Sequence, residues 1–259
     1  MNKLTYLSNH LKNGKLIRWP QQCFPLPVFI APCTFYSVTE SDRYMYQQMA
    51  INAFNEWERV SEGRLSFVLI NSMNDSQINL EWRRVDSKSL GTCYFNYDKD
   101  SRLYSAEVSI GISDGIIHKQ YMDENEVYHT ILHEVGHSLG LGHSTNSDDI
   151  MYTPHQYGQV TLSQRDINSI KWLYSLPYGA SLESLNKTYS LNCTNIDEII
   201  MKISKGEATS EFQKTLSNIH TPSRNLEDEQ DKLAKIKKFQ MSIQNVKLPK
   251  EIADKFKEK

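Results

Sequence analysis

The segment HEVGHSLGLGHS, which begins at His133, gathers four side chains that bind metals or transfer protons. Residues four apart on an α-helix lie on one face, about 6 Å apart along its axis, so His133 and His137 can direct their imidazoles at one ion. Glu134 is rotated by about 100°, which keeps its carboxylate off the ion but within reach of a water molecule. Gly140 lets the backbone turn sharply, and His143 follows as a third nitrogen ligand. The spacing predicts one metal site.

Three neutral imidazoles favour zinc, which they bind tetrahedrally at roughly 2.0–2.1 Å. The fourth position then stays open for water, as is typical of a catalytic zinc ion and not of a structural one. Two other interpretations remain open: the histidines could be core residues, or they could form a regulatory metal clip. Chance produces HExxH on ordinary helices much more readily than this extended pattern, so we favour a zinc enzyme with Glu134 as its general base.

Three amphipathic helices are expected to position these side chains. The first covers residues 39–60 and repeats an apolar residue every four positions. The second covers residues 123–140 and carries the first two histidines. Asp123, with Glu126 three positions later, forms a capping pattern at its start. The third covers residues 161–175.

Five short apolar segments between the helices and turns are expected to be strands. They are rich in β-branched and aromatic residues, and several alternate apolar with polar positions. Their ranges are 25–32, 64–70, 77–82, 91–98 and 105–112. Five strands with a long helix after the first predict a mixed α+β domain.

The composition excludes some classes of function. Of the 259 residues, 39% are hydrophobic, yet no apolar run approaches the roughly 18 residues that a membrane span needs. A formal net charge of -2 without a basic stripe gives no reason to expect nucleic acid as a partner. The four cysteines show no CxxC pair, which argues against a cysteine zinc site. Cys23 and Cys33 could form a bridge, but we favour free thiols.

The first residues, MNKLTYLSNHLKNG, include lysines but no apolar core and no small-residue cleavage site. They do not fit a Sec signal peptide. Three alternatives follow: a cytoplasmic protein, export by a non-classical route, or a signal that has been trimmed.

HEVGHSLGLGHS followed by DDIMY resembles the metzincin clan of zinc endopeptidases. Met151, eight residues past His143, matches the methionine of their Met-turn, a hairpin beneath the metal. Ser144 after the third histidine and the helix TLSQRDINSIKWLYS are similar to the matrixin branch, the matrix-metalloproteinase type, and a bacterial form without propeptide is favoured. The resemblance covers about residues 17–175. It implies a twisted five-stranded sheet with three helices, one catalytic zinc ion and the hydrolysis of peptide bonds in proteins.

The same resemblance implies how a peptide or protein substrate binds. The substrate would lie antiparallel to an edge strand near residues 92–95, with one side chain in a pocket beside the metal. The walls of that pocket would include His129, Thr153, Pro154 and Tyr157. For His129, which also falls on the histidine face, plain packing remains the alternative.

The chain departs from the matrixin pattern at several positions. No histidine occurs in residues 90–112, so the structural zinc ion of the family is not expected. Calcium at Asp98, Asp100 or Glu107 is a weak alternative. Arg165 stands where many matrixins have the first of two aspartates, so the contact linked to activation is not expected from that position, whereas Asp166 keeps the second aspartate. No propeptide motif is seen.

The composition changes after residue 176, where lysine and glutamate become frequent. We therefore expect a lead-in over 1–16, a catalytic domain over 17–176 and a helical extension over 177–259. The extension could contact the protein's own cleft or a partner. Rival interpretations are a zinc-holding module that binds peptides without cutting them, an interaction protein built around the extension, and a peptidase with one narrow target. Family analogy favours an extracellular location.

Overall fold

The computed structural model describes residues 4–35, 38–84, 89–112 and 123–208, all within one compact unit, Met1–Ser210. Five strands form its sheet: β1 (Leu26–Ile30), β2 (Phe67–Leu69), β3 (Ile78–Arg84), β4 (Gly91–Tyr97) and β5 (Leu103–Ile112).

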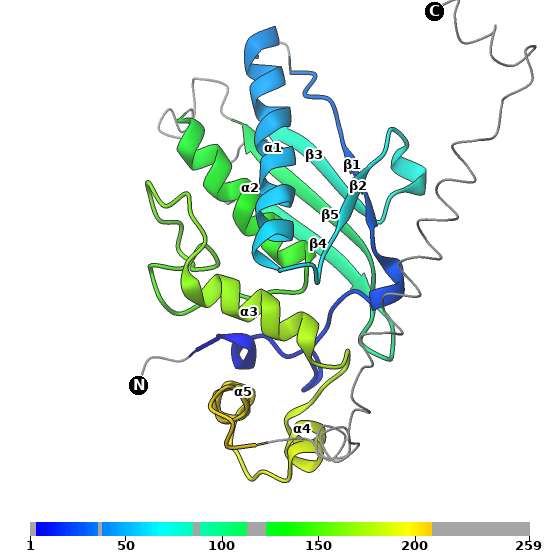
Figure 1. Ribbon diagram of the computed structural model, residues 1–259. Coiled ribbons are helices and arrows are strands. Elements are labelled where there is room, and N and C mark those ends of the chain that lie inside the picture. Colours follow the sequence, from blue (N-terminus) through cyan, green and yellow to red (C-terminus); the bar gives the residue numbers. More distant parts are fainter. Residues whose placement is uncertain (1–3, 36–37, 85–88, 113–122, 209–259) are drawn as a thin grey trace, which may run out of the picture. The chain divides into compact units, whose positions relative to one another are not determined.

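The strand order is β2-β1-β3-β5-β4 (Figure 1). The pairs β1–β2, β1–β3 and β3–β5 are parallel, whereas β4 pairs antiparallel with β5. In β3, Ile78, Leu80 and Trp82 are buried and Glu81 between them is exposed, as the alternating sequence predicts. The expected mixed α+β fold is confirmed, and β4 is an end strand of its sheet.

The described helices are α1 (Glu40–Val60), α2 (Glu124–Ser138), α3 (Gln164–Ser175), α4 (Leu182–Tyr189) and α5 (Ile196–Ser204), with 3₁₀ turns at Leu7–Asn9, Gln21–Cys23 and Met73–Asp75. The three helices predicted for the catalytic domain correspond to α1, α2 and α3. None of the helices described combines the length and apolarity that crossing a membrane requires.

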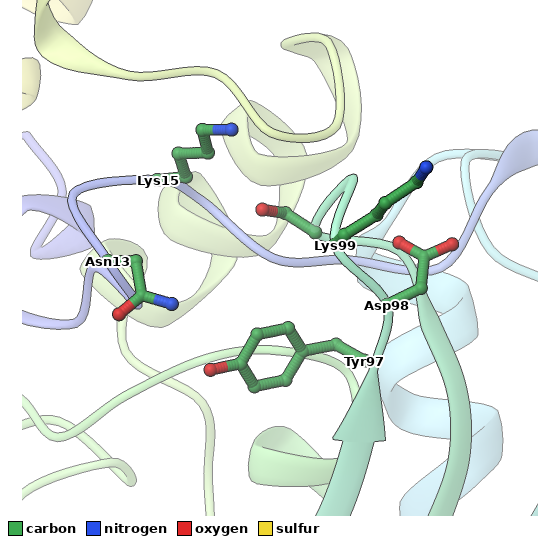
Figure 2. Close-up of a pocket in the computed structure, with 6 residues that line it drawn as sticks. Asn13, Lys15, Tyr97, Asp98 and Lys99 are labelled. Atoms are coloured by element: carbon green, nitrogen blue, oxygen red, sulfur yellow. The ribbon is translucent and has the colours of Figure 1, made fainter.

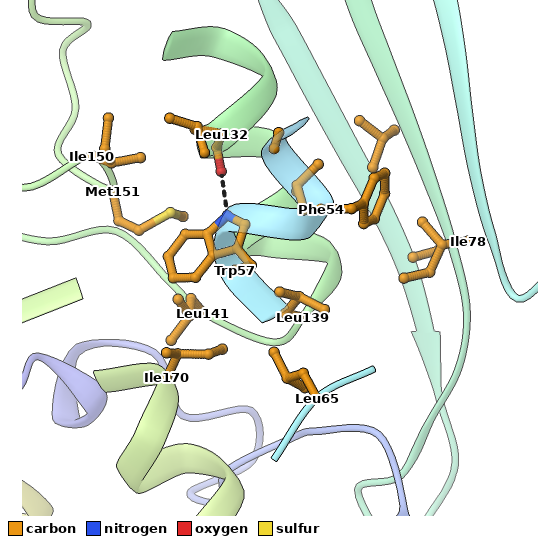
Figure 3. Packing of buried hydrophobic residues seen from close by; sticks show 14 of the residues in the cluster. Phe54, Trp57, Leu65, Ile78, Leu132, Leu139, Leu141, Ile150, Met151 and Ile170 are labelled. Carbon is orange, nitrogen blue, oxygen red and sulfur yellow. Dashed lines mark hydrogen bonds between the residues drawn. The ribbon is translucent and has the colours of Figure 1, made fainter. Parts of the chain in front are cut away.

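The main core lies where α1 and α2 pack together over the sheet (Figure 1). Trp57 of α1 is completely buried, and its indole Nε1 donates to the carbonyl of Leu132 on α2 at 3.0 Å. Figure 3 shows this indole beside Met151 and Leu141, which follow α2 in the chain. One large side chain therefore joins α1 to the helix that carries the histidines and to the loop that follows it.

Local sequence determines where α2 and α3 begin. The side chain of Asp123 accepts from the backbone N–H of Asn125 at the start of α2, as an N-cap residue does. At the start of α3, Ser163 and Asp166 form a reciprocal capping box. Gly140 adopts φ +94°, a left-handed conformation that lets the chain leave α2 abruptly.

Residues 4–19, which we call the N-terminal arm, pack against the last described helices. Thr5 Oγ1 donates to Asp197 of α5 at 2.5 Å, and Asp197 N donates to Ser8 Oγ at 3.0 Å. Further along the arm, Leu16 N donates to the Ala180 carbonyl at 2.8 Å. The arm is therefore part of the folded unit.

The expected helical extension is partly described, because α4 and α5 lie within residues 177–204. The rest of the expected extension, residues 209–259, lies outside the described residues. The boundaries at 16/17 and 176/177 remain predictions. The structure describes all four cysteines as free thiols.

Candidate metal centre

Three histidines converge at the C-terminal end of α2. The Nε2 atom of His137 lies 3.1 Å from Nε2 of His133 and 3.1 Å from Nε2 of His143. These three side chains form a group that could hold one metal ion. The helix supplies two of them one turn apart, and the turn at Gly140 returns the third.

Backbone carbonyls fix the orientation of two of the rings. His133 Nδ1 lies 2.7 Å from the Ile150 carbonyl, and His137 Nδ1 lies 2.8 Å from the Leu141 carbonyl. A carbonyl only accepts, so each Nδ1 must carry the proton and each Nε2 must expose its lone pair. A hydrogen bond from the other ring nitrogen to a carbonyl orients metal-binding histidines in the same way.

The facing lone pairs fit a zinc ion. Imidazole nitrogens bound tetrahedrally at 2.0–2.1 Å lie about 3.3–3.4 Å apart, close to the Nε2 separations of the cluster. Burial lowers the pKa of His133 to about 4 and lowers the pKa of His137 well below its usual value, so both rings are neutral, as metal ligands must be. Neutral acceptors held this close repel one another unless a cation lies between them.

Glu134 is buried beside the cluster. Burial raises the pKa of its carboxyl to about 7, and the charge of Arg83 opposes this rise. A Cβ atom added to Gly91 would lie only 2.5 Å from Glu134 Cγ. The start of β4 therefore has to be glycine for the glutamate to occupy its place against the sheet.

Met151 is completely buried beneath α2. A Cβ atom on Gly136 would overlap its sulfur, so the glycine inside HEVGH allows the methionine to pack directly under the histidines. The Met151 carbonyl also accepts from Ser144 N at 2.8 Å, which ties this turn to the residue after His143. The methionine thus lies beneath the part of α2 that carries the histidines, and its role as a Met-turn residue stays a prediction.

The residues expected to line a substrate pocket are only partly gathered. His129 is 2% exposed, its ring stacks on His133 at 6.3 Å, and its Nδ1 donates to the Gln159 carbonyl at 2.6 Å. Thr153, Pro154 and Tyr157 are exposed on the following loop. The structure therefore brings His129, and not these three side chains, against the histidine cluster.

His155, for which the sequence suggested no role, joins that loop to α2. Its Nε2 is in hydrogen-bond contact with Glu126, its ring lies 4.2 Å from the ring of His129, and Tyr157 stacks edge-on against it at 5.3 Å. The other oxygen of Glu126 accepts from Gly158 N at 3.0 Å. Glu126 therefore holds the loop instead of completing the helix cap that its spacing suggested.

One residue of the N-terminal arm, His10, lies against the metal centre, which sequence reasoning missed. A Cβ atom on Gly142 would overlap the side chain of His10, so the arm lies directly against the residue before His143. The next residues form a tight turn in which Asn13 and Gly14 have φ of 51° and 74°, closed by hydrogen bonds between Lys12 and Lys15. The dipeptide Asn-Gly is the usual signature of such a turn and could have revealed it.

Asp166 connects the arm to the metal centre. Its Oδ1 accepts from the Tyr6 hydroxyl at 2.8 Å, and its Oδ2 accepts from Ile150 N at 2.8 Å and Ser163 N at 2.9 Å. Ile150 is the residue whose carbonyl orients His133. Arg165 pairs with Asp149 at 3.1 Å, so it supports this region from the position where matrixins commonly have an aspartate.

Two of the three residues considered for calcium, Asp98 and Asp100, are engaged by a cation of the chain itself. Arg102 contacts Asp98 at 2.7 Å and Asp100 at 2.8 Å. Within the ranges that the structure describes, the three-histidine cluster is the only group found that could hold a metal ion. Calcium and the number of bound ions remain untested.

Several known proteins share sequence similarity with this chain. The model of the Matrixin peptidase family matches residues 33–175. A putative matrix metalloproteinase of Trichoplusia ni ascovirus 2c is 29% identical over 143 residues, which cover 48% of this chain and 28% of that protein. An interstitial collagenase of Oryctolagus cuniculus is 30% identical over 131 residues, or 47% of this chain and 26% of the collagenase.

A shorter match has higher identity. An interstitial collagenase of Sus scrofa is 47% identical over 57 residues, which cover 22% of this chain and 12% of that protein. In all three comparisons the matched region is less than a third of the relative's own length.

Proposed function

Because the chain belongs to the matrixin family, we propose that it is a zinc metalloendopeptidase that hydrolyses peptide bonds in proteins. One zinc ion is held by His133, His137 and His143, and Glu134 transfers the proton. The observation that carries this proposal is the meeting of three imidazole Nε2 atoms, with separations of 3.1 Å from His137 to each of the others, beside a buried carboxyl group.

A zinc ion bound by the three histidines would act as a Lewis acid that polarises the scissile carbonyl and lowers the pKa of bound water to about 7. Glu134 accepts the proton that the attacking water releases and donates it to the departing amine. The wall formed by α2 and the start of β4 keeps its carboxyl group in a poorly hydrated place, where such proton transfers are efficient. The Ile150 and Leu141 carbonyls hold His133 and His137 in the ligating tautomer.

The substrate lies along the outer edge of β4, antiparallel to that strand, because an end strand offers backbone groups for pairing with an extended peptide. One substrate side chain enters the space between His129 and the loop that carries Thr153, Pro154 and Tyr157. The hydrogen bonds from His155 and Gly158 to Glu126 support that loop.

The test is cleavage of an unbiased peptide mixture, read by mass spectrometry. Wild-type protein is compared with Glu134→Gln, which keeps the shape of the side chain, and with Glu107→Gln as a matched control on β5 outside the metal centre. We expect cuts with the wild type and the control and none with Glu134→Gln. Equal cutting by Glu134→Gln would refute the role of Glu134.

Zinc content is measured on the same samples by elemental analysis. We expect one zinc ion per chain in the wild type and in Glu134→Gln, and loss of zinc in a His133→Ala/His137→Ala variant. Zinc bound without any cutting would favour the rival interpretation of a peptide-binding module. Cutting that survives the loss of zinc would refute the metal mechanism.

A further inference from the structure

Two adjoining cavities lie between the N-terminal arm and the end of β4. The first, of about 400 Å³, is lined by residues of both segments and by His137, a proposed metal ligand. The second, of about 540 Å³, lies between Asn13 and Lys15 of the arm and the residues that follow β4. Figure 2 shows the second cavity, with the Tyr97 ring directed toward Asn13 and Lys15 on the arm.

Tyr97 lines both cavities, so together they form one groove that leads from the metal centre toward the loop between β4 and β5. We call it the arm groove. One wall is the edge strand, with Phe95 and Tyr97, and the other is the turn at Lys12 to Lys15. Lys12 extends over the Phe95 ring with its Nζ 5.8 Å from the ring centre.

The direction of β4 decides which part of a substrate enters the arm groove. The strand begins at Gly91, against Glu134, and ends at Tyr97, in the groove. A substrate antiparallel to β4 runs from the Tyr97 end toward Glu134. The residues that precede the cleaved bond therefore pass through the groove.

The groove carries an excess of positive charge. Lys12, Lys15 and Lys99 line it, and among the residues that the structure describes none of the three forms an ion pair. The acid in the groove, Asp98, is already satisfied by Arg102 at 2.7 Å and by two backbone N–H groups at 2.9 and 3.0 Å. Three lysines thus line the arm groove without an ion-pair partner among the described residues.

We propose that the arm groove binds the segment of a peptide substrate that precedes the cleaved bond, and that Lys12, Lys15 and Lys99 select acidic side chains in that segment. This inference rests on the proposed peptidase function and names its substrate class. It assigns a role in specificity to the N-terminal arm. His10 of the arm lies against Gly142, and this contact fixes the turn at Lys12 to Lys15 beside the metal centre.

The experiment uses two peptides that are identical from the cleaved bond onward. The two peptides differ only in the three positions that precede the residue on the N-terminal side of the cleaved bond. The first peptide carries Asp and Glu at these positions, and the second carries Asn and Gln. The measured quantity is the ratio of kcat/KM for the acidic peptide to kcat/KM for the neutral one. Because each value is divided by another from the same protein, a general loss of activity cancels.

Wild-type protein is compared with Lys12→Gln/Lys15→Gln/Lys99→Gln and with Lys205→Gln, a matched loss of one charge at the end of α5. We expect a wild-type ratio of about fivefold or more, the effect of one to three exposed charge pairs. The triple variant should bring the ratio close to one, and Lys205→Gln should leave it unchanged. Raising the salt concentration should lower the wild-type ratio, because exposed charges are screened.

A wild-type ratio near one, or a ratio that the triple variant preserves, would overturn the proposal. Folding of the triple variant is checked by circular dichroism and thermal unfolding, and Lys99→Gln alone serves as a milder substitution with a partial effect on the ratio. If the wild type cuts neither peptide, the proposed function fails. Binding to the groove is then measured separately, by fluorescence anisotropy of the labelled peptides with Glu134→Gln. We expect the acidic peptide to bind more tightly than the neutral one. Equal binding of the two peptides would overturn the inference.

Discussion

Replacing Tyr6 by phenylalanine removes one hydroxyl from the buried junction between the N-terminal arm and α3. That hydroxyl donates to Asp166 Oδ1 at 2.8 Å, and both side chains are buried, with 1% and 0% of their surface exposed. Asp166 accepts three hydrogen bonds with two oxygens, which is the pattern of an ionised carboxylate. The substitution therefore leaves a buried charge with one partner fewer.

Hydrogen bonds to charged groups contribute about 1.5–3 kcal/mol, and those between neutral groups about 0.5–1.5 kcal/mol. Tyr174 offers a matched control, because it is also buried and its hydroxyl donates to the neutral Leu139 carbonyl at 2.9 Å. We expect Tyr6→Phe to lower the free energy of unfolding by about 2 kcal/mol and Tyr174→Phe by about 1 kcal/mol.

The assay is urea unfolding of both variants at pH 7, followed by tryptophan fluorescence, with the slope against denaturant checked for constancy. A loss for Tyr6→Phe no larger than the loss for Tyr174→Phe would refute the assignment of a buried carboxylate at Asp166. Since Ile150 links Asp166 to His133, Tyr6→Phe should also weaken zinc binding, measured by competition with a chelator, whereas Tyr174→Phe should not.

Three further outcomes are expected. Gly142→Ala should lower the free energy of unfolding by about 1–3 kcal/mol, because the added methyl group overlaps His10. Adding His10→Gly to the same chain should recover most of this loss. Urea unfolding compares the double variant with both single variants. Removing the metal with a chelator should lower the melting temperature of the protein, and added Zn²⁺ should restore it. A ligand at 100 times its Kd stabilises the folded state by about 2.7 kcal/mol. An unchanged melting temperature would contradict zinc binding. A hydrogen bond from the Arg102 backbone N–H holds the pKa of Asp98 below 3.8, so the contribution of Asp98 to stability is present above that value and is lost as pH falls through the lower folded pKa. Asp98→Asn should therefore reduce the loss of stability on acidification below pH 3.8, measured by unfolding at stepwise lower pH.

The elements that local patterns define could be predicted from the sequence. Apolar periodicity and capping residues located α1, α2 and α3, and alternation located the strands. Strand ends were less accurate, as β2 shows: it covers Phe67–Leu69 within the expected 64–70. The reason lies in Leu65, whose N–H donates to Ser61 Oγ in the turn after α1 and is thereby withdrawn from the sheet.

The histidine cluster was also predictable, because its residues lie within one helix and one turn. Contacts between distant segments were not. Glu126 was assigned to a helix cap by its spacing, yet its carboxylate binds His155 and Gly158 on a loop. His10 lies against Gly142, and nothing in either local sequence indicates the other. Such pairs depend on how the whole chain folds, and their roles in the site remain proposals.

The open edge of β4 also bears on how the protein behaves at high concentration. An end strand presents backbone groups that can pair with the same strand of another copy and so seed aggregation. Tyr94, 70% exposed on that strand, adds an apolar contact that favours such pairing. The turn with Lys12 and Lys15 stands beside this edge, so two molecules that approached edge to edge would bring like charges together. We therefore expect these lysines to oppose aggregation through the edge of β4, the same edge along which we propose that the substrate binds.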